Sequence, residues 1–150
     1  SEMCIRDRYG TVPVPQKKRS MPYRRITPRD MWVDDPASPL YNQHFVLKHD
    51  PVTPWEFKQQ MKLNDYAHSL KLFIRHNAAS GREKPVPGAG SSIFFHIWRR
   101  DGGAPTAGCT AMSEENLRAM IAWLDPSQHP LYILLPAKEY LRLRGAWGLP

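Results

Sequence analysis

The sequence predicts a mainly β fold with one or two helices, and three observations support this prediction. Short apolar segments at 69–76, 93–98 and 131–136 have the length and pattern of strands. Fifteen prolines in 150 residues disfavour a helical bundle and favour short strands joined by turns. Helix-capping residues begin two further segments, at Thr53 and Ser113, so at least one helix should pack on the strands.

Two loop-like stretches come first along the chain. Residues 11–30 are rich in proline and arginine, and we expect them to be extended. Residues 31–45 are dense in turn-forming residues. Three aromatic side chains should attach this second stretch to the body: Trp32, Tyr41 and Phe45.

Two helices are expected. Thr53 and Glu56 form a capping box, and Pro54 suits the first helical position, which together predict a short helix that ends near Asp65. The clearer helix begins after Ser113 and ends by Pro126. Two acidic residues in its first turn interact favourably with the positive end of the helix dipole. One apolar stripe runs along this second helix: Leu117, Met120, Ile121 and Leu124.

Three strands are expected, separated by loops. Segment 69–76 alternates, so we expect a half-buried strand with one apolar face, formed by Leu70, Leu72 and Ile74. Segment 93–98 is continuously apolar, as in a central strand covered on both faces. Segments 81–92 and 99–108 contain glycine and proline and should be loops. Segment 131–136 should be a last buried strand.

The chain is expected to hold one structured domain, at 26–150, behind two leading segments. Residues 1–10, SEMCIRDRYG, resemble translated sequencing-adapter read-through, and we expect them to be foreign to the natural protein and to pack poorly. Residues 11–25 are a basic, Pro- and Arg-rich lead-in. Without Cys4, the chain has a single cysteine, which is either an inert buried thiol or a reactive one.

The net charge of +7 is unevenly distributed, because residues 1–30 hold eight Lys/Arg and three Asp/Glu, or +5. This basic segment is either a solvated arm or a contact for an anionic polymer, such as nucleic acid or cell-wall material. The sequence contains no nucleic-acid recognition motif, so only the charge supports binding to nucleic acid. No apolar run approaches the roughly 20 residues of a membrane-spanning helix, and no histidine or cysteine spacing is typical of a metal site.

His96 and Cys109 are the candidate reactive pair. Each taken alone is more typical of a core residue, but together they match a thiol nucleophile and its base. His96 lies on the 93–98 strand, and Cys109 follows Gly108 on the loop that returns from it and leads into a helix. Gly108 allows a sharp turn and close approach of a substrate. Backbone N–H groups of residues 110–115 should favour a thiolate and could hold an oxyanion.

The segment VPGAGSSIFFHIWRRDGGAPTAGCTAMSEENLRAMIAWLDP resembles the catalytic core of the L,D-transpeptidase (YkuD-type) family. The upstream segments MWVDDPASPLYN and PVPGAGS are also similar to segments of one branch of that family, so the resemblance covers residues 26–143. The chain departs from the family pattern in three ways. Its His-to-Cys interval is short, Ala107 replaces a common histidine, and Ala111 replaces a common Arg or Asn that helps to position substrate.

The resemblance implies a mixed β-sandwich-like L,D-transpeptidase fold that needs no cofactor and no metal, and that acts on peptidoglycan stem peptides outside the cytoplasm, in the periplasm or cell wall. It implies a catalytic group of Cys109, His96 and Gly108, with Thr106 or a backbone carbonyl orienting the imidazole. Further residues are expected at the oxyanion or substrate site: Thr110, Ser91, Ser92 and Asn77. Cys109 would form a thioester with the stem peptide, which an amine or water would resolve.

Three alternatives stay open at this point. The first is an L,D-carboxypeptidase or hydrolase on the same substrates. The second is a non-catalytic cell-wall-binding module on the same fold, held by the basic segment. The third, nucleic-acid binding, rests on charge alone, and we expect no nucleic-acid partner. The sequence does not indicate an oligomeric state.

Overall fold

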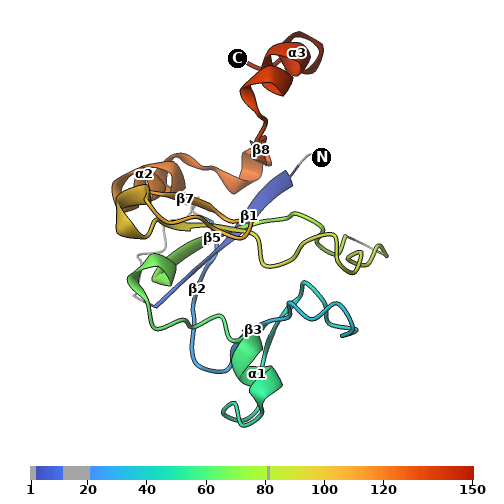
Figure 1. Cartoon of the computed structure of the whole chain (residues 1–150), viewed down its shortest axis with the longest axis vertical. Coiled ribbons are helices and arrows are strands. Elements are labelled where there is room, and N and C mark those ends of the chain that lie inside the picture. The colour runs from blue at the N-terminus through green and yellow to red at the C-terminus, as the bar shows by residue number, and fades with distance from the viewer. Residues whose placement is uncertain (1–2, 12–20, 81) are drawn as a thin grey trace.

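The computed structural model describes residues 3–11, 21–80 and 82–150, and residues 3–7 by their backbone alone. These described residues form a six-stranded mixed sheet, a separate two-stranded sheet and three α-helices (Figure 1). The predicted mainly β class is therefore confirmed, and one helix lies beyond the two that the sequence indicates. Most of the basic lead-in, at 12–20, lies outside the described residues.

The large sheet has both parallel and antiparallel neighbours. Its main path runs, in spatial order, through β2 (Tyr23–Arg25), β1 (Met3–Gly10), β5 (Leu70–Ile74), β6 (Phe94–Ile97) and β7 (Thr110–Met112). The pairs β1/β2 and β6/β7 are parallel, and β1/β5 and β5/β6 are antiparallel. The sixth strand, β8 (Leu131–Tyr132), pairs with the start of β1.

Strand β1 lies inside the sheet, between β5 and β2, and its first two residues also pair with β8. Arg8 and Tyr9 are only 3% and 6% exposed. The expectation that residues 1–10 pack poorly is therefore wrong for Met3–Gly10, whose backbone pairs with three strands. This pairing does not test whether residues 1–10 are foreign to the natural protein, because ladder hydrogen bonds are formed by the backbone and are compatible with many different side chains. Their foreign origin therefore stays a prediction.

The large sheet has an apolar core on each face. On one face, side chains of β5 and β6 pack with Leu117, Ile121 and Leu124 of and beside α2 (Glu114–Trp123), which covers the sheet in Figure 1. We call the other face the aromatic face. Its buried residues are Tyr9, Ile26, Trp32, Met61, Phe73 and Phe94.

The aromatic face is covered by the layer between residues 26 and 68. This layer contains the antiparallel pair β3 (Asp30–Trp32) and β4 (His44–Val46), the helix α1 (Pro54–Gln59) and the 3₁₀ helix η1 (Tyr66–His68). The capping box at Thr53 is present, as predicted, but α1 ends at Gln59, short of Asp65. Because this layer covers β5, all five residues of that strand are buried, and the expected half-buried strand is wrong.

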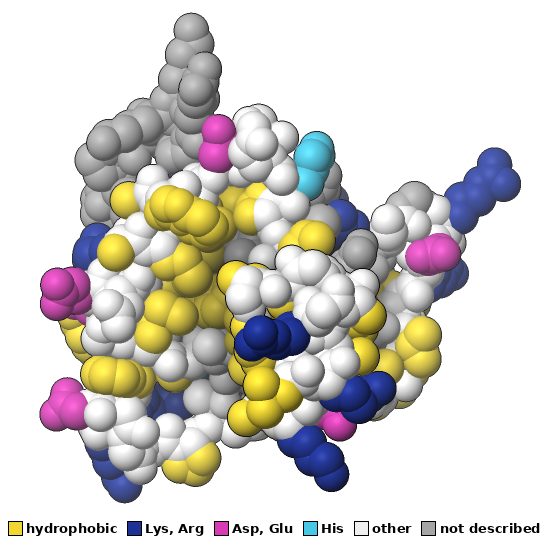
Figure 2. Space-filling view, turned by 90° about the horizontal axis from the view of Figure 1, so that it is seen from above, with side chains coloured by type: hydrophobic (Ala, Val, Ile, Leu, Met, Phe, Trp, Pro, Cys, Tyr) yellow, Lys and Arg dark blue, Asp and Glu magenta, His cyan; other side chains and the backbone are white. Residues whose placement is uncertain are grey.

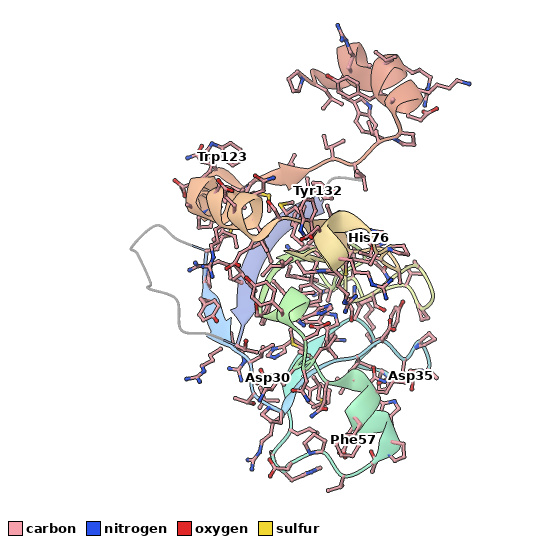
Figure 3. All side chains as sticks on the ribbon, turned by 60° about the vertical axis from the view of Figure 1, so that its left-hand side comes forward. Asp30, Asp35, Phe57, His76, Trp123 and Tyr132 are labelled. Carbon is pink, nitrogen blue, oxygen red and sulfur yellow. The ribbon has the colours of Figure 1, made fainter. Side chains whose placement is uncertain are left out.

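The C-terminal part of the chain differs most from expectation. Ser113 caps α2 as predicted, and η3 (Pro126–Gln128) follows. Segment 131–136 forms only the two-residue β8, and Leu131 and Leu134 are exposed, so the expected buried strand is wrong. The helix α3 (Ala137–Trp147) has no buried residue and stands apart from the body (Figures 1 and 3). In the described part of the chain, no helix is long and apolar enough to cross a membrane.

Candidate active site

Strands β6 and β7 hold His96 and Cys109. A parallel pair needs a crossover of about a dozen residues, and residues 98–109, which include η2 (Arg100–Gly102), supply it. The register pairs Phe95 with Thr110 and His96 with Ala111. Cys109 therefore comes level with Phe94, one step before β7 begins.

His96 and Cys109 share the aromatic face of the sheet. Cys109 packs against the cluster that contains Phe94, and Phe95 and Ile97 point to the opposite core, so alternation places His96 with Phe94. Across neighbouring strands, Cα atoms two residues out of register lie about 8 Å apart. His96 is 2% exposed, and Cys109 is half-buried. A substrate would therefore meet the thiol before it met the imidazole.

The His96 imidazole is held by its own strand. Its Nδ1 lies 2.7 Å from the carbonyl oxygen of Ile97, so we assign the ring proton to Nδ1, which leaves Nε2 with a free lone pair. Burial lowers the pKa of His96, and the Ile97 carbonyl opposes this. The ring is therefore neutral near pH 7, as a general base must be. It also stacks on His68, with ring centroids 4.6 Å apart.

The Cys109 thiol is protonated at rest. Burial raises the pKa of Cys109, and the backbone of Phe94, Lys71 and then Arg99 oppose this rise. The Cys109 Sγ donates a 3.4 Å hydrogen bond to the Ser92 carbonyl. This arrangement differs from the resting thiolate that the sequence analysis expects, because the neighbouring dipoles and charges do not outweigh burial. The thiol needs a base at the moment of attack.

Thr106 and Gly108 shape the turn in front of Cys109. Thr106 Oγ1 donates a 2.5 Å hydrogen bond to the Cys109 carbonyl and accepts a 3.4 Å one from the Gly108 N–H. Gly108 has φ +156°, and a Cβ there would lie 3.1 Å from Ile93 Cδ1. The carbonyl of Ile97, rather than Thr106, contacts the imidazole. Thr106 thus acts on the loop that carries the cysteine.

The other predicted site residues are engaged elsewhere. Thr110 Oγ1 lies 2.8 Å from the Tyr132 hydroxyl, and Tyr132 packs on the opposite core. Ser91 Oγ donates to Asp34. Asn77 exchanges hydrogen bonds with the backbone of Val86 and also donates to the Gly90 carbonyl, so it braces loop 86–90. Of the four predicted substrate-binding residues, only Ser92 forms a hydrogen bond with the thiol, and it does so through its backbone carbonyl.

Asn42, which sequence reasoning placed only in a turn, organises the backbone beside the thiol. Its Oδ1 accepts from Trp32 Nε1 at 2.8 Å and from the Ser92 N–H at 3.1 Å. Its Nδ2 donates to the carbonyls of His76 and Asn77. Asn42 is 3% exposed and has φ +53°, a conformation that asparagine tolerates. It therefore connects loop 33–43 to the segment whose carbonyl accepts the hydrogen bond of the Cys109 thiol.

Four charged or titratable residues surround the pair, and none of them was predicted from the sequence to belong to the site. Asp65 Oδ2 accepts from Arg99 Nη2 at 2.6 Å, and Asp65 Oδ1 lies 2.7 Å from His68 Nδ1. Burial lowers the pKa of His68 to about 4, against the opposing effect of Asp65, so the ring on His96 is neutral. Lys71 is buried opposite His96 in the β5/β6 register. A charged residue on an alternating strand normally faces solvent, so no sequence signal marked Lys71.

Within the described ranges, no group of three or more His, Cys, Asp or Glu is arranged to hold a metal ion. The site offers a half-buried thiol, a neutral imidazole with a free Nε2, and nearby cations. Such a set can carry out acyl transfer through a thioester.

Comparison with known proteins identifies the family. The family model of the L,D-transpeptidase catalytic domain (YkuD) matches residues 5–133, which include most of β1, all of β2 to β8 and both members of the His96/Cys109 pair. Comparisons with curated proteins and with solved structures gave no match. The match covers far more than half of the 150 residues. The chain therefore belongs to the L,D-transpeptidase catalytic domain (YkuD) family.

Proposed function

We propose that this chain is a cysteine-dependent L,D-transpeptidase that acts on peptidoglycan stem peptides through a thioester acyl-enzyme. Family membership supports the class of reaction. The observation that carries the assignment of residues is the placement of Cys109 and His96 on one face of neighbouring strands. The thiol lies at the accessible end of this pair and the base at the buried end.

The first half of the reaction transfers the acyl group to the enzyme. As substrate binds, His96 Nε2 takes the proton of Cys109, and the sulfur attacks the carbonyl on the L-centre side of an L,D-peptide bond. Backbone N–H groups of Gly108–Thr110 hold the oxyanion. The protonated imidazole then gives its proton to the departing D-alanine nitrogen, the C–N bond breaks, and a thioester remains.

The second half of the reaction resolves the thioester. His96 Nε2 takes a proton from an amine of a neighbouring stem peptide, the nitrogen attacks the thioester carbonyl, and the sulfur leaves to regain its proton. The product is a cross-link. Water in place of the amine gives an L,D-carboxypeptidase. Ala111, which stands where many family members have Arg or Asn, leaves both outcomes open to experiment.

The proposed place of action is outside the cytoplasm, in the periplasm or cell wall, because that is where peptidoglycan stem peptides are cross-linked. A cell-wall-binding module is the second candidate function, supported by the basic residues near the N-terminus. Figure 2 argues against one large polyanion site on the face that it shows, because Lys and Arg side chains there are scattered.

The test is incubation with purified disaccharide-tetrapeptides, followed by mass spectrometry. The wild-type chain should release D-alanine, and a cross-linked dimer mass would separate transpeptidation from hydrolysis. Cys109→Ala and His96→Ala should both lose activity by at least about 100-fold, the lower range for removal of a general base. His129→Ala, at an exposed position, is the matched control and should retain activity.

Two outcomes would overturn the proposal. D-alanine release by Cys109→Ala at the wild-type rate would make Cys109 a core thiol. Failure of the folded wild-type chain to turn over any stem peptide, together with binding to intact cell walls, would favour the binding module. A carbapenem-type β-lactam provides an independent readout, because it should add its mass to tryptic peptide 101–118, which contains Cys109.

A further inference from the structure

Lys71 is a buried cation that the reaction described above does not use. It lies on β5, where it pairs with His96 of β6 and with Tyr9 of β1. It is 4% exposed. Lysine is almost never fully buried without a partner, because desolvating an ammonium is costly.

Two contacts hold the Lys71 ammonium on the aromatic face. Its Nζ donates a 2.7 Å hydrogen bond to the carbonyl of Met61. The same atom lies 5.4 Å from the centre of the Phe94 ring, a cation–π distance. Phe94 is the residue level with Cys109 across β6 and β7. The Met61 contact and the Phe94 ring thus hold the ammonium on the side of the sheet where the sulfur lies.

The charges around Lys71 come from several elements. Burial lowers the pKa of Lys71 to about 8, and Cys109 and then Asp65 act in the opposite direction. Lys71 in turn acts on Cys109, on His96 and on His68, and Arg99 acts on the first two. The group is still largely a cation at pH 7. Of these neighbours, Cys109 is the one whose ionised form the Lys71 ammonium stabilises most.

We propose that Lys71 is a positioning residue for the Cys109 thiolate, whose negative charge its fixed ammonium stabilises when His96 removes the proton. The proposal rests on the proposed function of Cys109 as nucleophile. Lys71 keeps its proton throughout and forms no bond to substrate, since the proton of Cys109 goes to His96 Nε2. The same cation disfavours a charged His96 at rest, so it keeps the base neutral until the thiol gives up its proton.

A purely structural role for Lys71 predicts different behaviour. Methionine has a similar length without the charge, and it suits an aromatic core. Lys71→Met should therefore fold at least as stably as wild type, because it removes the cost of a buried ammonium. If Lys71 only filled space, this variant would also keep the reactivity of Cys109. If the proposal holds, stability is kept while thiol reactivity and turnover fall.

The experiment measures iodoacetamide labelling of Cys109 against pH, read on tryptic peptide 101–118, which excludes Cys4. Lys71→Met should move the pH of half-maximal labelling upward by about 1 unit, the lower range for loss of a neighbouring opposite charge. On tetrapeptide stems, the kcat of Lys71→Met should fall about 10-fold with KM unchanged, because a rise of about one unit in the pKa of the thiol makes its deprotonation about tenfold less favourable. Lys71→Arg keeps the charge and should restore part of both losses. Lys58→Met, at an exposed position of α1, is the control and should match wild type.

An unchanged labelling midpoint and kcat in folded Lys71→Met would overturn the proposal. This failure is separate from failure of the proposed function. If Cys109→Ala loses activity while Lys71→Met behaves as wild type, the nucleophile stands and only the role of Lys71 is wrong. If Cys109→Ala keeps full activity, the proposed function is wrong, and the role of Lys71 fails with it.

Discussion

Replacing Asp30 with asparagine should destabilise the protein by about 2 kcal/mol at pH 7 and by about 1 kcal/mol at pH 3. Asp30 is fully buried at the start of β3, in the layer that covers the aromatic face (Figure 3). Its carboxylate accepts from Arg24 Nε at 2.5 Å and from Thr27 N and Oγ1 at 2.8 and 2.7 Å. His44 Nε2 lies 2.9 Å from the same carboxylate.

The magnitude follows from the pKa of Asp30. Burial alone would raise this pKa, but the hydrogen bonds from Arg24, Thr27 and His44 outweigh it and lower the value from 3.8 to about 2. Because the folded pKa is the lower one, the stabilisation is fully present above pH 3.8 and is lost as the pH falls through about 2. One pKa unit is worth about 1.4 kcal/mol, so the full contribution is about 2 kcal/mol, and roughly half of it remains at pH 3.

The assay is urea unfolding followed by tryptophan fluorescence at pH 7, 4 and 3. The difference in free energy of unfolding between wild type and Asp30→Asn should stay near its full value at pH 4 and shrink at pH 3. Asp50→Asn is the matched control, because Asp50 also accepts from an arginine, Arg29, but at an exposed site, where such pairs contribute little. A difference that is the same at all three pH values would refute the reasoning, because it would then come from packing and not from the charge.

Two further predictions concern residues near the thiol. His68→Ala should lower kcat several-fold, because it removes the ring that stacks on His96. His68→Phe keeps a ring and should retain more activity. Equal D-alanine release by both variants would show that stacking is irrelevant. Asn42→Ala should lower the free energy of unfolding by at least about 2 kcal/mol, because it leaves the N–H groups of Trp32 and Ser92 without their acceptor. Urea denaturation measures this loss, and a wild-type midpoint would contradict it.

Local signals explain which elements could be predicted from the sequence. The capping box at Thr53 and the cap at Ser113 involve residues three positions apart, so adjacent sequence determines them. The continuous apolar run around β6 predicted a strand covered on both faces, and all four residues of that strand are buried. The length of β8 could not be predicted in this way, because an apolar run pairs only where a neighbouring strand is available. Among the residues that the structure describes, β8 pairs only with Met3 and Cys4 of β1.

The candidate site was partly predictable for a similar reason. Cys109 and His96 stand out because their side chains have few roles other than chemistry or core packing, and because a strand, a glycine and a helix cap surround them in sequence. Their hydrogen-bond partners do not stand out. The Ile97 and Ser92 carbonyls that bind them are backbone atoms, which every residue has, so no residue type indicates them.

By itself, the sequence determined the mainly β class and two helix starts, since each depends on residue types a few positions apart. It also indicated His96 and Cys109 as the candidate pair, because of their residue types and the elements around them. Only the tertiary structure decided the protonation and the surroundings of that pair. The layer of β3, β4 and α1 covers the aromatic face, and this burial keeps Cys109 a thiol and His96 neutral. The same layer encloses Lys71, which the alternation of β5 would place in solvent. Burial depends on what packs against a strand from elsewhere in the chain, and the pattern of the strand alone does not contain that information.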